Sequence, residues 1–145
     1  MGMRDQETIL ATGQAVTAVG DTPTTNIYDT GAVGPADLGL VPELWLNTKV
    51  DVTASSAGAA TVQPVLQSSP DSNTWTDDQL GPVMPVASLA EGTYMWRTHF
   101  PLGEQRYLRV VWRTAVAALT AGEFSAWIGL AIDHNVPRAS GFSVQ

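Results

Sequence analysis

The side chains best suited to metal chemistry are two histidines, His99 and His134, which lie far apart in a chain without cysteine. Zinc and iron sites in proteins need three or four ligands held close together. A cupin-type jelly roll would place two histidines near each other on one strand with a glutamate nearby, and this sequence has no such group. We therefore predict no metal site and no cofactor, and we expect His99 to be an ordinary strand residue.

A run of acidic and hydroxyl side chains, Asp71–Asp78, superficially resembles a calcium-binding loop. An EF-hand loop needs glycine at its sixth position and glutamate at its twelfth, where this chain has Thr76 and Pro82. The adjacent Asp77 and Asp78 point apart in an extended chain, which suits no facing acid–base pair. The sequence also lacks a nucleophile elbow, a phosphate-binding loop and a dinucleotide fingerprint. We predict no catalytic residues and a protein that is not an enzyme.

Five tryptophans are candidates for binding rather than catalysis. Exposed tryptophans can form a sugar-stacking platform, as in a carbohydrate-binding module, whereas buried ones anchor a core or an interface. Trp96 and Trp112 share strand faces with other apolar residues, which favours the core. Trp45 and Trp127 lie opposite the apolar faces of their strands, so we predict that they contact another protein, where tryptophan is enriched. Trp75 lies in a loop and suits either role.

Four of the seven basic residues gather in one short stretch of sequence: Arg97, Arg106, Arg109 and Arg113. Arginine suits interfaces because its planar group makes forked hydrogen bonds and is weakly hydrated. The alternative is a solvated strand face whose arginines pair with neighbouring aspartates or glutamates. The sequence leaves both interpretations open, and we predict these four arginines as candidate interface residues.

Composition narrows the function classes further. The 145 residues suit one domain, and 44% of them are hydrophobic while only 14% are charged. A net charge of −7 argues against a nucleic-acid partner, because phosphates need a basic surface. Without cysteine there is no disulfide or thiolate. No stretch of 18 apolar residues occurs, and the N-terminal residues lack the apolar core of a secretory signal, so we expect no membrane partner.

The elements that must carry these side chains are short strands with alternating apolar and polar residues. Alternation is clearest over residues 44–53, where Leu46 and Val50 face one way and Trp45 and Lys49 the other. The pattern predicts further strands over residues 9–17, 24–29, 60–68, 83–89, 94–100, 106–114 and 123–133. We expect turns or loops at residues 19–23, 30–42, 54–59, 69–78 and 115–122. Pro64 predicts an edge or a bulge in its strand.

About eight strands with long connections and no convincing helix predict an all-β fold. We expect an antiparallel β-sandwich of the jelly-roll type, formed by residues 1–133. Residues 134–145 contain Pro137, Gly141 and an isolated Phe142, and they cannot build a core alone. We predict that they form an extended C-terminal tail, or an arm that docks on a neighbour through Phe142.

The residues also resemble a known family, the jelly-roll capsid cement (decoration) proteins of tailed bacteriophages, of the Bordetella-phage type. The similarity covers roughly residues 14–133, in the order and spacing of soft strand-and-turn motifs. These motifs are Gln14–Thr17, Thr25–Gly31, Leu44–Val52, Ser56–Val62, Leu66–Asp71, Phe100–Gly103, Arg106–Arg109, Leu119–Gly122 and Ile128–Asp133.

The resemblance implies a non-enzymatic protein that is made in the host cytoplasm and binds the exterior of the virion capsid. There it would clamp neighbouring subunits of the major capsid protein. It further implies a homo-oligomer, with a dimer favoured and a trimer possible. The alternative is a carbohydrate-binding module or the base of a head fibre, using exposed aromatic side chains.

Overall fold

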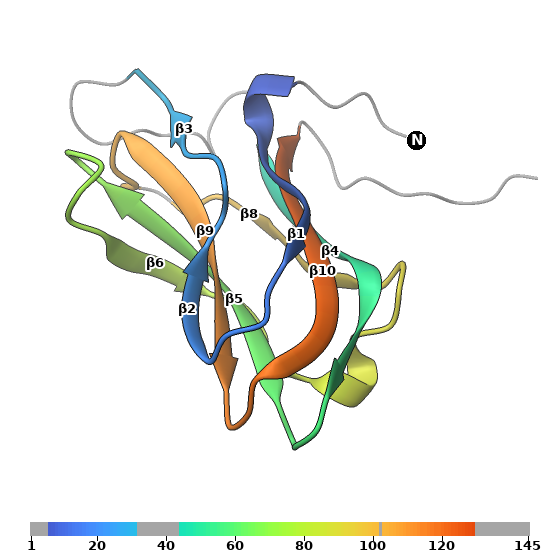
Figure 1. Ribbon diagram of the computed structural model, residues 1–145. Helices are drawn as coiled ribbons and strands as arrows, with labels where there is room; N and C mark the ends of the chain where they lie inside the picture. The colour runs from blue at the N-terminus through green and yellow to red at the C-terminus, as the bar shows by residue number, and fades with distance from the viewer. Residues whose placement is uncertain (1–5, 32–43, 102, 130–145) are drawn as a thin grey trace, which may run out of the picture.

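A computed structural model describes residues 6–31, 44–101 and 103–129 of the chain. Its described part contains ten strands, two short 3-10 turns and no α-helix (Figure 1). The elements in chain order are η1 (Gln6–Thr8), β1 (Ile9–Ala15), β2 (Gly20–Pro23), β3 (Tyr28–Asp29), β4 (Trp45–Ser56), β5 (Thr61–Ser69), β6 (Thr76–Leu80), β7 (Met84–Pro85), η2 (Val86–Ser88), β8 (Tyr94–His99), β9 (Tyr107–Ala115) and β10 (Leu119–Gly129).

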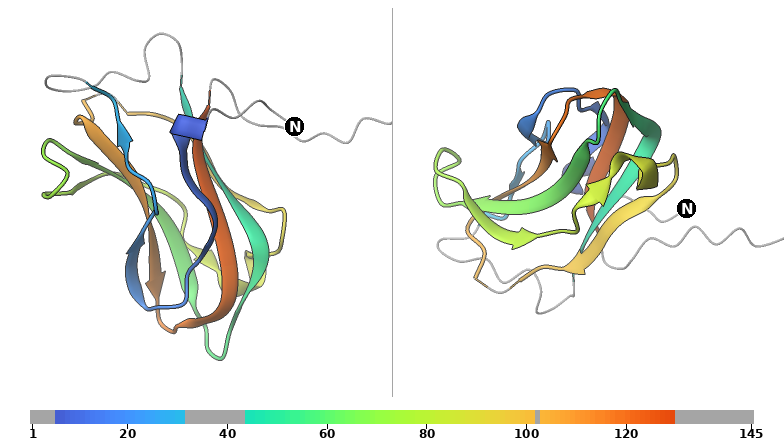
Figure 2. Two further views of the ribbon diagram at one scale, coloured as in Figure 1. Left: turned by 45° about the horizontal axis from the view of Figure 1, so that its top comes forward. Right: turned by 90° about the horizontal axis from the view of Figure 1, so that it is seen from below.

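The strands form two antiparallel sheets that face each other (Figures 1 and 2). The first sheet has the order β1-β10-β4-β8, and the second has the order β2-β9-β5-β6. The short β3 pairs with β9, and the short β7 pairs with β5. The eight main strands therefore pair first with last, second with seventh, third with sixth and fourth with fifth. This is the pairing of a long hairpin rolled into a sandwich, and the predicted jelly-roll sandwich is confirmed.

The core lies between the sheets, where alternate residues of each strand meet. Leu46 and Val50 of β4 are wholly buried, as the alternation predicts. The rings of Trp112 on β9 and Phe124 on β10 pack across the sandwich, with 5.2 Å between their centroids. Trp96 of β8 packs against the same cluster. The core role predicted for Trp96 and Trp112 is confirmed.

Two strands lie where the sequence predicts turns or loops. Residues 19–23 were expected to turn, but Gly20–Pro23 forms β2 and pairs with the end of β9. Residues 69–78 were expected to be a polar loop, but the strand β6 begins at Thr76. Both strands are short and polar, so they lack the alternation that marks a half-buried strand. They form because the backbone of a neighbouring long strand is available for pairing.

Other strand bounds also differ from expectation. Of residues 24–29 only Tyr28–Asp29 is strand, and of residues 83–89 only Met84–Pro85 is strand, followed by η2. β10 begins at Leu119 rather than at residue 123. The predicted boundary at residue 133 and the tail 134–145 lie outside the described residues and stay predictions.

Pro64 does not mark a sheet edge, because its strand β5 lies between β9 and β6. The carbonyl of Pro64 accepts a hydrogen bond from the Gly81 amide at 2.8 Å, on the side facing β6 and β7. The nitrogen of a strand residue points to the same side as its carbonyl, here the gap between β7 and β6. Proline is tolerated inside this sheet because no partner strand at the gap requires its missing N–H group.

Candidate protein interface

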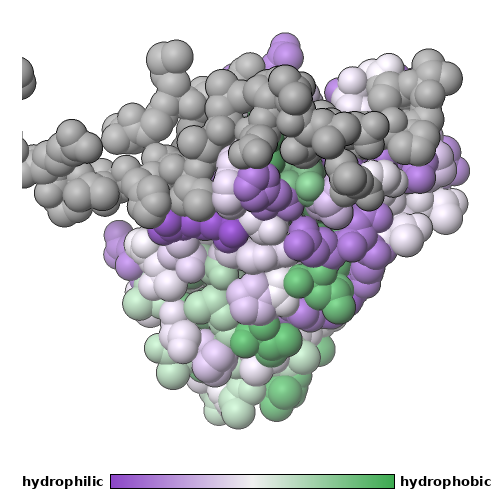
Figure 3. Space-filling view, turned by 180° about the vertical axis from the view of Figure 1, so that it is seen from behind, coloured by the Kyte–Doolittle hydropathy of each residue, from purple (hydrophilic) through white to green (hydrophobic). Residues whose placement is uncertain are grey.

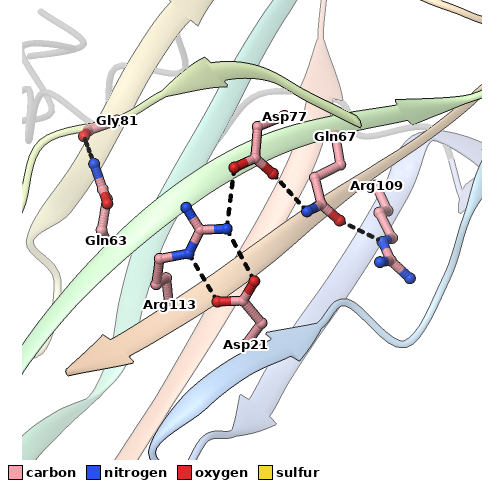
Figure 4. Close-up of polar contacts among 7 residues, drawn as sticks. All are labelled: Asp21, Gln63, Gln67, Asp77, Gly81, Arg109 and Arg113. Carbon is pink, nitrogen blue, oxygen red and sulfur yellow. Dashed lines mark hydrogen bonds and ion pairs between the residues drawn. The ribbon is translucent and has the colours of Figure 1, made fainter. Parts of the chain in front are cut away.

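Arg113 of β9 holds together three strands on the outer face of the second sheet (Figure 4). Its guanidinium donates two hydrogen bonds to the carboxylate of Asp21 on β2, at 2.8 and 2.9 Å. A third hydrogen bond, of 3.1 Å, reaches Asp77 on β6. The hydrogen bond from Arg113 lowers the pKa of Asp21, and Asp21 in turn raises the pKa of Arg113. The ion pairs tie edge strands to the centre of the sheet.

The network continues from Asp77 to Arg109 through a glutamine (Figure 4). The Gln67 amide donates to Asp77 at 2.7 Å, and its oxygen accepts a hydrogen bond from Arg109 at 2.9 Å. The guanidinium of Arg109 also lies 4.0 Å from the ring centroid of Trp75, within cation–π range. Burial lowers the pKa of Arg109 below its usual value, but an arginine stays charged at neutral pH.

These polar side chains cover apolar residues on the outer face of the second sheet. Val111 lies between Arg109 and Arg113 on β9, and Val65 is its direct partner on β5. Both valines are 0% exposed although they point away from the core. The long side chains beside them lie along the sheet with their stems over apolar surface. These two valines are therefore covered by contacts within the chain.

Arg106 makes a second ion pair near the start of β9. It donates two hydrogen bonds to the carboxylate of Asp29, at 2.7 and 2.9 Å. Asp29 also accepts a hydrogen bond from the Gly31 amide at 2.8 Å. These hydrogen bonds lower the pKa of Asp29 to about 2, with that from Arg106 the larger cause.

An aromatic group lies on the outer face of the first sheet, formed by β10, β4 and β8. Trp45 and His99 are direct strand partners, and their rings lie 3.5 Å apart between centroids. The ring of Trp127 meets Tyr94 edge-on at 6.1 Å, and the Arg97 guanidinium lies 3.6 Å from the Tyr94 centroid. The ring–ring contacts link β8 to β4 and β10 on the outer face of the first sheet, and the cation–π contact lies within β8.

The structure separates the predicted interface residues into two groups on opposite faces. Trp45, Arg97 and Trp127 lie on the first sheet, and the other three arginines lie on or beside the second. Arg106 and Arg113 are paired with aspartates, as in the alternative that the sequence left open. Trp127 is only 2% exposed, so its ring is already buried within the chain. Phe142 lies outside the described residues.

Sequence reasoning did not single out the partners of these arginines, namely Asp21, Asp29, Gln67 and Asp77. Asp21 is 92 positions from Arg113, and Asp77 is 36 positions from it. Charge spacing along one strand carries no information about such distant partners. The only signal was the general excess of acidic residues, which offers each arginine a carboxylate somewhere.

Within residues 6–31, 44–101 and 103–129, no three histidine or carboxylate side chains gather in a way that suits a metal ion. No helix in this part of the chain has the length and hydropathy of a membrane span.

Comparison with known proteins places the chain in a family. The family model Bbp16 matches residues 10–128, which run from β1 to the end of β10 and include both sheets. The chain belongs to the Bbp16 family. Bbp16 is a Bordetella phage protein family, so the protein is related to bacteriophage proteins. The curated proteins contain no match to the chain.

Proposed function

We propose that this Bbp16-family protein is a structural component of a tailed-phage head and not an enzyme. It binds the outer surface of the capsid and stabilises contacts between subunits of the major capsid protein, as a cement or decoration protein. It acts as a homo-oligomer, with a dimer favoured. The family match across residues 10–128 carries this proposal, because it covers the whole sandwich rather than a single motif.

The shape and the internal contacts suit this role. A cement protein must stay rigid while it holds its neighbours, and the two sheets here share a continuous core. Ion pairs across β2, β9 and β6 brace the second sheet on its outer face. Many copies on one shell can hold it firmly through contacts that are individually weak, because each bound copy adds to the total. The net charge of −7 disfavours binding to DNA.

The carbohydrate-binding alternative requires aromatic rings that are open on one face. Trp112 and Trp127 are buried, and the remaining three tryptophans are partly buried. The Trp75 ring carries Arg109 at 4.0 Å, and Trp45 is in contact with His99. Trp75 and Trp45 thus each already have a partner within the chain, which does not favour a sugar platform.

Co-sedimentation with empty heads tests the proposal. Purified protein is mixed with heads of the phage that encodes it, assembled without this protein, and the pellet is analysed at increasing protein concentration. We expect saturable binding and heads that withstand a higher temperature before they break open. Bovine serum albumin serves as the negative control. Absence of the protein from the pellet, together with retention on a glycan column, would overturn the proposal in favour of sugar binding.

A further inference from the structure

One end of the sandwich is built from segments without any charged residue. The strand pairings Gly20–Thr114, Thr61–Ala115 and Leu119–Ser56 bring the β1–β2, β4–β5 and β9–β10 connections to this end. β7 and η2 join them through a hydrogen bond from the Val86 amide to the Ala60 carbonyl at 3.0 Å. Residues 16–20, 52–60, 82–90 and 114–122 together form what we call the apolar end. None of the chain's 7 basic and 14 acidic residues falls in these four segments.

Exposed apolar side chains concentrate at the apolar end. The described part of the chain has six large hydrophobic residues that are well exposed, and four of them lie in these segments. They are Val19 (57% exposed), Val52 (42%), Val83 (60%) and Val116 (76%). Figure 3 shows green and pale residues gathered at the lower end of the molecule, with purple residues further up. Soluble proteins rarely expose contiguous apolar surface, and where they do, the surface is often an interaction site.

The loops of the apolar end are held in place by one another. The Ser56 hydroxyl donates to the Ala118 carbonyl at 2.7 Å, and the Val16 amide donates to the Gly122 carbonyl at 3.2 Å. The β4–β5 and β9–β10 loops pack so closely that a Cβ atom on Gly58 would lie 2.9 Å from the Ala117 methyl. A preformed surface loses little conformational entropy when it binds.

Val116 is the most exposed of the four valines and has an unfavourable backbone. Its φ angle is +71°, a left-handed conformation that β-branched residues rarely adopt. Glycine or asparagine would suit this turn better and would keep the surface polar. The chain instead places an apolar side chain that is 76% exposed in the β9–β10 turn. Strain that benefits neither the turn nor the core is typical of binding positions.

We propose that the apolar end is the surface that docks on the phage shell, and that its partner is an uncharged apolar patch on the outer face of the major capsid protein. This inference rests on the proposed function. It moves the docking point away from Arg106 and Arg113, which are paired with aspartates within the chain, and from Arg109, which donates to Gln67.

Charge and area identify the partner. Acidic residues border the apolar end, because the Glu91 amide donates to the Thr53 hydroxyl and Glu123 is the strand partner of Val52. The four segments themselves offer no charge to a partner, so the patch that meets them is uncharged. Four strands at ~4.8 Å spacing in two sheets ~10 Å apart give an end with a cross-section of roughly 200 Å². A stable dimer needs about 800 Å² from each partner, so a second copy docked end to end would bind weakly. A small contact suits a partner that is repeated many times on one shell.

Paired aspartate substitutions test the docking surface. Val116→Asp and Val19→Asp each place a charge at the apolar end, and Ile27→Asp makes the same change elsewhere. Ile27 is 44% exposed and precedes β3, which pairs with the first residues of β9, so it lies toward the opposite end. Each variant is tested for binding to heads that lack the protein. We expect at least tenfold weaker binding for the two apolar-end variants and less than a twofold change for Ile27→Asp.

Val116→Gly keeps the test independent of folding. Glycine accepts a φ of +71° without strain, so this variant should melt at or above the wild-type temperature while it binds heads several-fold more weakly. Equal binding by Val116→Asp and Ile27→Asp would overturn the inference while the proposed function stands. Failure of the wild-type protein to bind heads would overturn both. If the free protein is an oligomer and Val116→Asp dissociates it in sedimentation velocity, the apolar end binds a second copy of this chain, and the inference of docking on the capsid protein is overturned.

Discussion

The aspartates Asp29 and Asp21 form ion pairs with arginines of the same chain. Asp29 receives two hydrogen bonds from Arg106 and one from the Gly31 amide, and all of them favour its charged form. Its pKa in the folded chain is about 2, below the ordinary value of 3.8. Asp21 is shifted in the same direction by Arg113. Pairs this exposed contribute modestly to stability and respond to salt.

The lowered pKa values predict how stability changes in acid. The folded state binds a proton at Asp29 less readily than the unfolded state, so this contribution is complete above pH ~4. It is lost as the pH falls through about 2. We expect the wild-type free energy of unfolding to fall between these pH values more steeply than that of Asp29→Asn. Urea unfolding at pH 7, 4, 3 and 2 measures both slopes.

Asp78 provides the opposite control for this titration. Burial raises its pKa, so the folded state favours the protonated form and Asp78→Asn removes a cost that appears as the pH rises. We expect this variant to gain stability relative to wild type at neutral pH and to show little difference in acid. Parallel slopes for wild type and Asp29→Asn would contradict the role of the Asp29–Arg106 pair.

At the scale of elements, the passage from β6 to β7 depends on very close packing. Gly81 lies between these strands, and its amide donates to the Pro64 carbonyl of β5 at 2.8 Å. A Cβ atom at Gly81 would lie 2.7 Å from that carbonyl oxygen and 2.9 Å from the Trp96 ring of the opposite sheet. Only glycine fits, because backbone stands on one side and a core ring on the other.

We therefore expect Gly81→Ala to destabilise the fold by about 1–3 kcal/mol through overpacking. This corresponds to a drop in Tm of very roughly 3–10 °C for a domain of this size. Gly58→Ala is the comparison variant and should cost less, because its Cβ atom would lie 2.9 Å from a single methyl group, that of Ala117, whereas at Gly81 it would meet a backbone carbonyl, a proline ring and a core ring. Thermal unfolding followed by circular dichroism measures both variants. An equal or larger loss for Gly58→Ala would show that packing at the β6–β7 passage is looser than these distances indicate.

At the scale of the whole molecule, the proposed role predicts binding that depends on repetition. If each copy contacts the shell through a small area, an isolated capsid subunit should bind at least tenfold more weakly than an assembled head. Surface plasmon resonance with immobilised protein compares disassembled subunits with intact heads at equal subunit concentration. Equal affinity for the two would show that one contact suffices and that the shell adds no avidity.

The sequence predicted the architecture well where strands are long. β9 alternates clearly, so its inner and outer faces were predicted residue by residue. The faces of β4 and β8 were predicted only in part, because irregular pairing interrupts their alternation: Met95 lies in the core, Tyr94 lies on the outer face, and Val52 is 42% exposed. β2 and β6 were missed, because an edge strand such as Gly20–Pro23 or Thr76–Leu80 buries too little apolar surface to show a period. The arginines were recognised as a cluster, but their partners were not.

The amino-acid sequence by itself determined the all-β class, the acidic charge and the core-facing side of those strand stretches that alternate without interruption. These properties are local, because side chains alternate along an extended backbone wherever that backbone lies. Only the tertiary structure decided that Arg113 pairs with Asp21 and Asp77, that Trp127 is buried, and that four separate uncharged segments meet at one end. Contacts between residues so far apart in the sequence depend on which strands are neighbours in a sheet. Backbone hydrogen bonding between distant parts of the chain sets that strand order.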